Sequence, residues 1–86
     1  MISRAYIIRD RDGFYRVRIR FPVFHHVLES EPYTDFADAK HFALSIAHAV
    51  PSIGRITYGA VGGYRAVARR RQKELDQELI NIRIAA

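Results

Sequence analysis

Two runs of alternating residues near the start of the chain predict a β-hairpin. Residues 4–10 and 14–21 are rich in Tyr, Ile, Val and Phe, and they flank the pair Asp12-Gly13. In the second run, apolar residues alternate with arginines, as expected for a strand with one buried and one solvated face. An Asp-Gly pair between two such runs favours a type I′ turn, because both central residues of that turn need positive φ. The two runs are therefore predicted to form antiparallel strands.

A two-residue turn at Asp12-Gly13 determines which side chains share a face of this hairpin. Arg9 would then lie opposite Arg16, and directly opposed residues lie on the same face. One face is predicted to carry the arginines Arg9, Arg11, Arg16, Arg18 and Arg20. The other is predicted to carry the apolar residues Tyr6, Ile8, Val17, Ile19 and Phe21. A four-residue loop keeps this register, whereas a three-residue loop breaks it.

A third strand and a helix are predicted to follow the hairpin. The strand covers about Val23–Glu29. Thr34 or Asp35 can accept hydrogen bonds from the first turn of a helix over about residues 35–49, which ends before Pro51. The apolar arc of this helix predicts that three large side chains cover the apolar face of the sheet: Phe36, Phe42 and Ile46.

The last third of the chain predicts a connector or short strand over residues 52–59 and a second helix over about Tyr64–Arg83. The predicted fold class is therefore α+β. A three-stranded antiparallel sheet with a helix packed on one face (β-β-β-α) occupies residues 1–50, and the connector and C-terminal helix occupy residues 51–86. No repeat or long linker divides the chain, so residues 1–86 predict a single small domain.

The second helix has an apolar stripe that can pack on its own domain or on a partner. The residues of the stripe that we assign to a partner helix or a dimer are Tyr64, Val67, Leu75, Leu79 and Ile82. A chain of this size offers little surface for both helices if one sheet face stays open. A homodimer is therefore one predicted state.

Charge changes this picture, because it is unevenly distributed. The 86 residues contain 14 Lys and Arg against 9 Asp and Glu, which gives a formal charge of +5. Residues 4–20 hold six arginines and two aspartates, residues 29–38 hold four acids and no base, and residues 65–73 hold five bases and no acid. Such segregation concerns binding partners rather than the fold.

The predicted arginine face is the most specific candidate site. A row of guanidinium groups on a pleated surface matches a phosphate backbone, and arginine also pairs with guanine edges in the major groove. Opposed arginines repel each other, so the pair Arg9 and Arg16 calls for a counter-charge. The alternative is a solvated sheet face whose arginines pair with Glu29, Glu31 or a helix.

A second basic candidate is the run of bases on the C-terminal helix, of which we assign Arg69, Arg70 and Lys73 to nucleic-acid contact. The alternative is the charged outer face of a surface helix. Arg69, Arg70 and Arg71 together span about 200° of the helix, so at least one of them must point toward the core or a partner.

The sequence offers no constellation for catalysis, a metal or a cofactor. Cysteine is absent, which excludes thiolate ligands and a disulfide framework and is compatible with a reducing cytoplasm. The segment around Gly62 lacks the GK[ST] of a phosphate-binding loop, and no serine has an evident base. The histidines His25, His26, His41 and His48 lack metal-ligand spacing. We expect no enzyme, no cofactor, no metal site and no membrane span.

Two short motifs resemble the arm-type DNA-binding domain of phage integrases. They are Asp12-Gly13-Phe14-Tyr15-Arg16-Val17-Arg18 and the helix start Tyr33-Thr34-Asp35-Phe36-Ala37-Asp38-Ala39, within roughly residues 5–50. The resemblance implies that the sheet enters the major groove through Arg9, Arg16, Arg18 and Arg20. Tyr15 stands where a tryptophan is common, and no recombinase catalytic domain follows. The chain is comparably similar to small bacterial β-β-β-α proteins that have no established activity.

The sequence thus predicts a non-enzymatic, cytoplasmic protein that binds nucleic acid, DNA in particular, through the arginine face of its sheet. The alternative is a phage- or bacteria-derived protein-binding or inhibitor module that uses its charged surface or C-terminal helix against an acidic protein partner.

Overall fold

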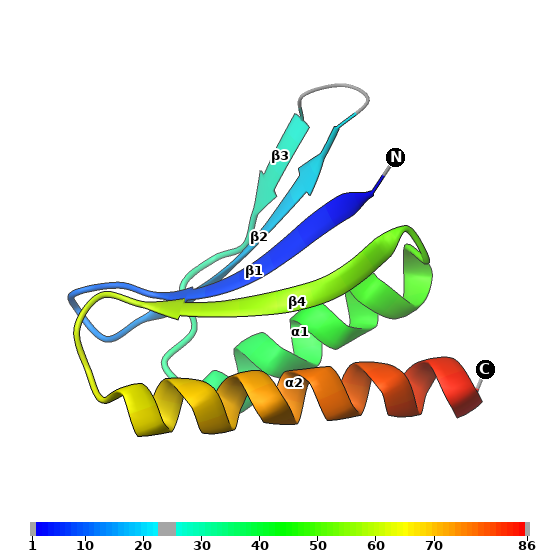
Figure 1. Ribbon diagram of the computed structural model, residues 1–86. Coiled ribbons are helices and arrows are strands. Elements are labelled where there is room, and N and C mark those ends of the chain that lie inside the picture. The colour runs from blue at the N-terminus through cyan, green and yellow to red at the C-terminus, as the bar shows by residue number, and fades with distance from the viewer. Residues whose placement is uncertain (1, 23–25, 86) are drawn as a thin grey trace.

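A computed structural model describes residues 2–22 and 26–85 of the chain (Figure 1). Its elements, in chain order, are β1 (Ser3–Arg9), β2 (Tyr15–Phe21), β3 (His26–Glu29), α1 (Phe36–Ala49), β4 (Ile53–Ala60) and α2 (Arg65–Ala85). The predicted third strand began at Val23, and residues 23–25 lie outside the described residues. Neither described helix is both long and apolar enough to cross a membrane.

The sheet has four strands in the order β3-β2-β1-β4. The predicted α+β class and the antiparallel pairing of the first three strands are confirmed, but the prediction of three strands is wrong because a fourth, parallel strand joins the sheet. β1, β2 and β3 pair antiparallel, and β4 joins the other side of β1 in parallel. A parallel pair needs a long crossover connection, which α1 provides.

Residues 52–59 are predicted only as a connector or short strand, because the apolar residues of β4 do not alternate. Ile53 and Ile56 are both buried although they are three positions apart. The register between β1 and β4 shifts at this point, since Ser3 pairs with Ile53 but Ala5 pairs with Ile56. One additional residue in β4 restores the inward direction of its side chains, as in a β-bulge.

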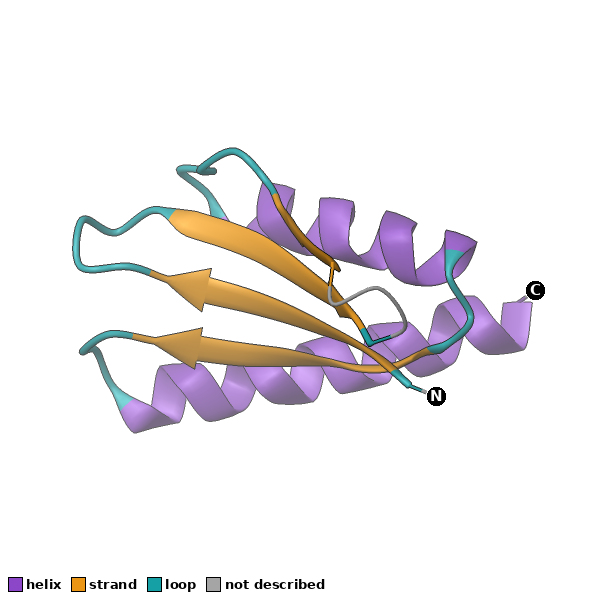
Figure 2. Ribbon diagram, turned by 90° about the horizontal axis from the view of Figure 1, so that it is seen from above, coloured by secondary structure: helices purple, strands orange, loops and turns teal. Residues whose placement is uncertain are grey.

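Both helices pack on the same face of the sheet and leave the other face open (Figure 2). α1 packs against β1 and β2, and α2 packs against β4. The core between the two layers is formed mainly by aliphatic residues from the strands and from both helices: Ala5, Ile7, Val17, Ile19, Ala39, Ala43, Ala47, Ile53, Ile56, Leu75 and Leu79. A helix on one face of the sheet, as predicted, is therefore present, and a second helix lies beside it.

The helix α1 matches its predicted span, but its packing face differs in detail. Three alanines four residues apart, Ala39, Ala43 and Ala47, are fully buried, whereas Phe36, Phe42 and Ile46 are only partly buried around them. Asp35 is at the N-cap position with extended backbone, and its side chain makes no capping hydrogen bond. The small alanine side chains allow the helix to approach the sheet closely, and the larger residues pack around the edges of this contact.

Lys40 links the two helices. Its Nζ lies 2.7 Å from Glu74 Oε1 and 2.8 Å from Glu78 Oε2, both on α2. The hydrogen bonds to Glu74 and Glu78 raise the pKa of Lys40 above its ordinary value. The ammonium group is therefore charged at neutral pH and holds α1 beside α2.

The outer edge of β4 is closed by one side chain of α2. Gln72 Nε2 donates to the Ile56 carbonyl at 2.8 Å, and its Oε1 accepts from the Tyr58 N–H at 2.8 Å. Gln72 also donates to Asp76, whose carboxylate accepts two hydrogen bonds from Arg55. The side-chain amide thus replaces the peptide group of a neighbouring strand and blocks a position where another chain could pair with this edge.

We predict that Gln72→Ala lowers the free energy of unfolding by about 2 kcal/mol, because a partly buried N–H and C=O lose their partners. The matched control is Gln77→Ala on the same helix, whose exposed side chain donates a hydrogen bond to Asn81 at the surface. The control should change stability by less than about 0.5 kcal/mol. Urea unfolding measures both, and equal effects would show that Gln72 does not support the edge.

Candidate nucleic-acid interface

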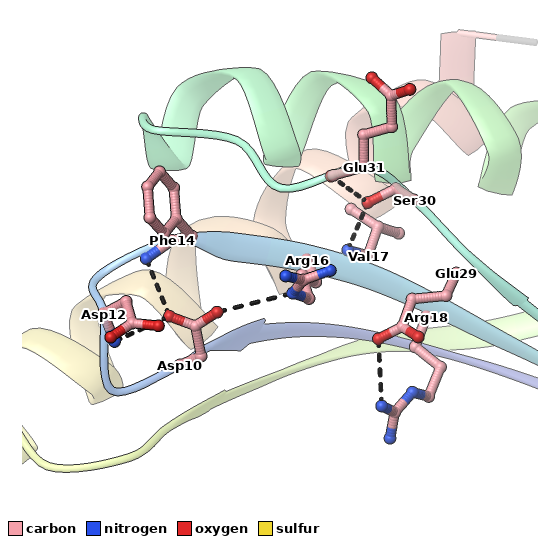
Figure 3. A network of polar contacts seen from close by, with 9 residues as sticks. All are labelled: Asp10, Asp12, Phe14, Arg16, Val17, Arg18, Glu29, Ser30 and Glu31. Carbon is pink, nitrogen blue, oxygen red and sulfur yellow. Dashed lines mark hydrogen bonds and ion pairs between the residues drawn. The ribbon is translucent and has the colours of Figure 1, made fainter.

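The Asp10 side chain organises the turn between β1 and β2 (Figure 3). Its Oδ1 accepts hydrogen bonds from the backbone N–H groups of Asp12 (3.0 Å) and Phe14 (3.1 Å). The Asp10 N–H in turn donates to the Phe14 carbonyl at 2.9 Å, so these two residues face each other across three loop residues. Gly13 completes the loop with a φ of 85°, a conformation that glycine adopts without strain.

This three-residue loop breaks the predicted register by one position. Arg9 pairs with Tyr15 and Ile8 with Arg16, whereas a two-residue turn predicts that Arg9 pairs with Arg16. Each residue of β1 therefore points to the face opposite to the predicted one, because side chains alternate along a strand. The positions predicted on β2 are unaffected.

The prediction that Arg9 and Arg11 belong to the arginine face is consequently wrong. Arg9 lies on the helix-covered side, where it lines a cleft with Tyr15 and Arg71, and Arg11 is exposed in the turn. The prediction that Tyr6 and Ile8 face the helices is wrong for the same reason. The error arose because the Asp-Gly pair was assigned to a two-residue turn, while the Asp10 carboxylate stabilises a loop one residue longer.

The open face instead presents three cross-strand pairs of β1 and β2. They are Arg4 with Arg20, Tyr6 with Arg18, and Ile8 with Arg16. Arg16, Arg18 and Arg20 are therefore brought together as predicted. Arg4, which the sequence analysis had not assigned, joins them.

Two arginines of this face have acidic partners. Arg16 Nε lies 3.5 Å from Asp10 Oδ2, and Arg18 Nη2 lies 3.1 Å from Glu29 Oε1 on β3 (Figure 3). The side chains are 30–44% exposed, so each pair contributes little to stability and can be opened by a competing anion. Pairing with Glu29 was part of the alternative hypothesis for this face.

Arg4 and Arg20 have no such partner. They are exposed and directly opposed, and no carboxylate among residues 2–22 and 26–85 lies within ion-pair distance of either. Like charges directly opposite each other destabilise a strand pair. An anion bound between the two guanidinium groups would relieve this repulsion.

An open pocket adjoins these residues on the same face. It has a volume of about 470 Å³, and Arg4, Tyr6, Arg55 and Thr57 are among its lining residues. Tyr6 is half-buried in the middle of β1, between Arg18 on β2 and Thr57 on β4. The face therefore combines an aromatic ring, a hollow beside it and two unpaired cations.

The basic run of α2 lies on the other side of the molecule. Arg69, Arg70 and Lys73 are exposed there, on the helix layer rather than on the open sheet face. The prediction that one arginine of the run must point inward is confirmed by Arg71, whose Nη1 donates to the hydroxyls of Tyr15 and Tyr58. The eight predicted nucleic-acid contacts are thus divided between separate surfaces.

The partner stripe of α2 packs mostly within its own chain. Leu75 and Leu79 are buried in the core, Ile82 packs against it, and Val67 lines the cleft beside Arg71. Tyr64 precedes α2 and is 82% exposed. A homodimer stays a prediction, and the two leucines offer no surface for it.

No protein-family model, curated protein or solved structure matches this chain. The resemblance to arm-type integrase domains therefore stays a prediction. The functional argument therefore depends on the positions and chemistry of the side chains in this structure.

The described histidines do not gather into a site. His26 stacks on Phe21 with ring centroids 6.3 Å apart, and His41 and His48 are exposed on α1. His25 lies outside the described residues. Among the residues that the structure describes, no three His, Asp or Glu side chains are grouped to hold a metal ion.

We predict that Asp10→Ala lowers the free energy of unfolding by about 1 kcal/mol, since two N–H groups of the turn lose their acceptor. Asp12→Ala is the matched control, because only the backbone N–H of Asp12 takes part in the turn. The control should stay within about 0.5 kcal/mol of the parent in chemical denaturation. A larger loss for the Asp12 variant would contradict the role given to Asp10.

Proposed function

We propose that this protein is a small non-enzymatic nucleic-acid-binding protein and that the open face of its sheet is the binding surface. The observation that carries the proposal is that Arg4 and Arg20 are directly opposed and exposed, with no ion-pair partner among residues 2–22 and 26–85. Arginine forms bidentate, charge-assisted hydrogen bonds with phosphate, so a phosphate between the two residues replaces a repulsion with two attractions. Arg16 and Arg18 extend the basic row along β2.

The position of Tyr6 favours a single strand as the ligand. Tyr6 lies one cross-strand pair along from Arg4 and Arg20 and lines the pocket, so a base can stack on its ring while the two arginines hold an adjacent phosphate. A four-stranded sheet spans about 14 Å between its outer strands. The major groove of B-DNA is about 12 Å wide, so the whole face does not fit into it.

A protein partner is the second candidate function. Ile80 and Ile84, one helical turn apart on α2, are 52% and 78% exposed. Together with the bases at the start of α2, they favour an acidic partner with an apolar patch. A stoichiometric protein complex that is indifferent to nucleic acid would support this candidate over the first.

We predict that Arg4→Gln/Arg20→Gln weakens binding of a fluorescent single-stranded oligonucleotide by at least about tenfold, because two charge-assisted contacts are lost. The slope of log affinity against log salt should decrease in magnitude by about 0.7, since the two arginines neutralise one phosphate. Fluorescence anisotropy at several salt concentrations measures both, with single-stranded DNA, RNA and duplex DNA as parallel ligands.

The matched control is Arg69→Gln/Arg70→Gln, which removes the same charge from α2. It should retain the affinity and the salt slope of the parent to within about twofold and about 0.3, respectively. Equal weakening by the two double variants, or no binding by the parent at low salt, would contradict the sheet face as the binding surface.

A further inference from the structure

A second basic site lies at the end of the molecule where β1 and β4 finish and α2 begins. The β1–β2 turn and the β4–α2 loop lie at this same end (Figure 1), and the Val61 N–H donates to the Arg9 carbonyl. A cleft of about 280 Å³ at this end is lined by residues of β1, β2 and β4, of the β4–α2 loop and of the first turns of α2. The polar side chains that line it are Arg9, Tyr15, Tyr58, Tyr64 and Arg71.

Arg71 lines this cleft and is held there by contacts with three aromatic side chains. Its Nη1 donates to Tyr15 Oη at 2.7 Å and to Tyr58 Oη at 2.9 Å. Its guanidinium carbon lies 4.6 Å from the centroid of the Phe36 ring, a cation–π contact. Burial opposes the charge, but the hydrogen bonds to Tyr58 and Tyr15 outweigh it, so the pKa of Arg71 is raised.

The charge of Arg71 is not neutralised. Within the described part of the chain, no carboxylate pairs with Arg71, and its Nε and Nη2 groups have no hydrogen-bond acceptor. These nitrogens form the edge with which a guanidinium group binds an oxyanion in bidentate geometry. They are also not among the buried polar atoms that lack a partner, so solvent reaches them.

The other polar groups of the cleft are donors as well. Tyr15 and Tyr58 already accept from Arg71, which leaves their hydroxyl hydrogens free to donate. Arg9 adds a second guanidinium group, placed alongside Gly13 of the β1–β2 turn. No acidic residue lines the cleft. Two guanidinium groups and the hydroxyls of Tyr15 and Tyr58 therefore line a space with no carboxylate among its lining residues.

We propose that this cleft binds a phosphate monoester, with Arg71 and Arg9 as its ligands and Tyr15 and Tyr58 as additional donors. A monoester dianion matches two guanidinium groups in charge, and its oxygens can accept from all four side chains. The cleft volume of about 280 Å³ is close to the lower end of the range for ligand pockets, about 300–1,000 Å³. It can therefore hold a phosphate group with a small organic substituent.

The cleft is independent of the proposed nucleic-acid surface. Arg9 lies on the helix-covered side of β1, and Arg4 lies on the open side five residues earlier, about 16 Å along the strand. The two sites can therefore be tested by separate variants, and either proposal can fail alone.

The test is an NMR titration of the ¹⁵N-labelled protein with inorganic phosphate, in which potassium chloride keeps the ionic strength constant. We expect saturable shifts at the amides of Gly62 and Gly63, which line the cleft. The dissociation constant of the cleft is taken from these two amides, because the open face can bind phosphate separately through Arg4 and Arg20. Absence of saturable shifts at the cleft would overturn the proposal.

Arg9→Gln and Arg20→Gln are the paired variants, since each removes one charge from a different face. The Arg9 side chain makes no hydrogen bond or ion pair within the described residues, so the substitution should leave the fold intact. Arg9→Gln should raise the phosphate Kd about tenfold, and Arg20→Gln should leave it within about twofold. Equal effects would indicate general electrostatic attraction and would also overturn the proposal.

Arg71→Lys keeps the positive charge but removes the planar guanidinium group that binds an oxyanion in bidentate geometry. We expect this variant to lose the saturable shifts at Gly62 and Gly63. Thermal unfolding of this variant separates loss of the ligand from loss of the fold, and Arg9→Gln remains decisive if the variant does not fold.

Two further ligands identify the source of the phosphate. Adenosine monophosphate represents a small metabolite, and an oligonucleotide with a 5′ phosphate represents a nucleic-acid end. The oligonucleotide is compared with its 5′-hydroxyl twin in the Arg4→Gln/Arg20→Gln background, so that the open face does not contribute. Binding of either phosphorylated ligand at Gly62 and Gly63 supports the proposal, and binding of the twin alone contradicts it.

Discussion

The hydrogen bonds of the Asp10 carboxylate determine the arrangement of charge on this protein. By accepting from two N–H groups of the turn, Asp10 stabilises a three-residue loop and thereby sets the pairing of β1 with β2. The register then decides which side of the sheet each residue of β1 faces. Arg4 and Tyr6 reach the open face, and Arg9 reaches the helix side, because of the length of one turn.

The distribution of acidic residues explains where the uncompensated charge remains. Carboxylates neutralise Arg16, Arg18 and Lys40, and a further one binds Arg55 at the edge of the sheet. Among the described residues, no carboxylate pairs with Arg4 and Arg20 on the open face. None pairs with Arg9 and Arg71 in the cleft at the other end of β1 either. At each of these two places, two guanidinium groups can be reached by an oxyanion.

Part of this arrangement could be predicted from the sequence. The alternation of β2, the helix ending before Pro51 and the inward arginine of the basic run all depend on short-range periodicity, and the structure confirms them. The register of β1 could not be obtained from periodicity, because both faces of that strand carry apolar residues. An aspartate two positions before Asp12 was the available signal, since Asx side chains stabilise such loops.

The fourth strand and the cleft depend on contacts between distant residues. Ile53 and Ile56 break the period of two because of a bulge, so β4 had no clear strand pattern. The surroundings of Arg71 combine residues from β2, α1 and β4, which no local spacing brings together. Periodicity along the chain indicates which face a residue takes, but not which residues meet there.

The most direct test of the nucleic-acid surface is to map it in solution. Amide and arginine Nε–H signals of the ¹⁵N-labelled protein are followed as a short single-stranded oligonucleotide without terminal phosphates is added. The account predicts the largest shifts at Arg4, Tyr6 and Arg20 and small ones at Arg69 and Arg70. Shifts confined to the two arginines of α2, or no shifts at low salt, would contradict it.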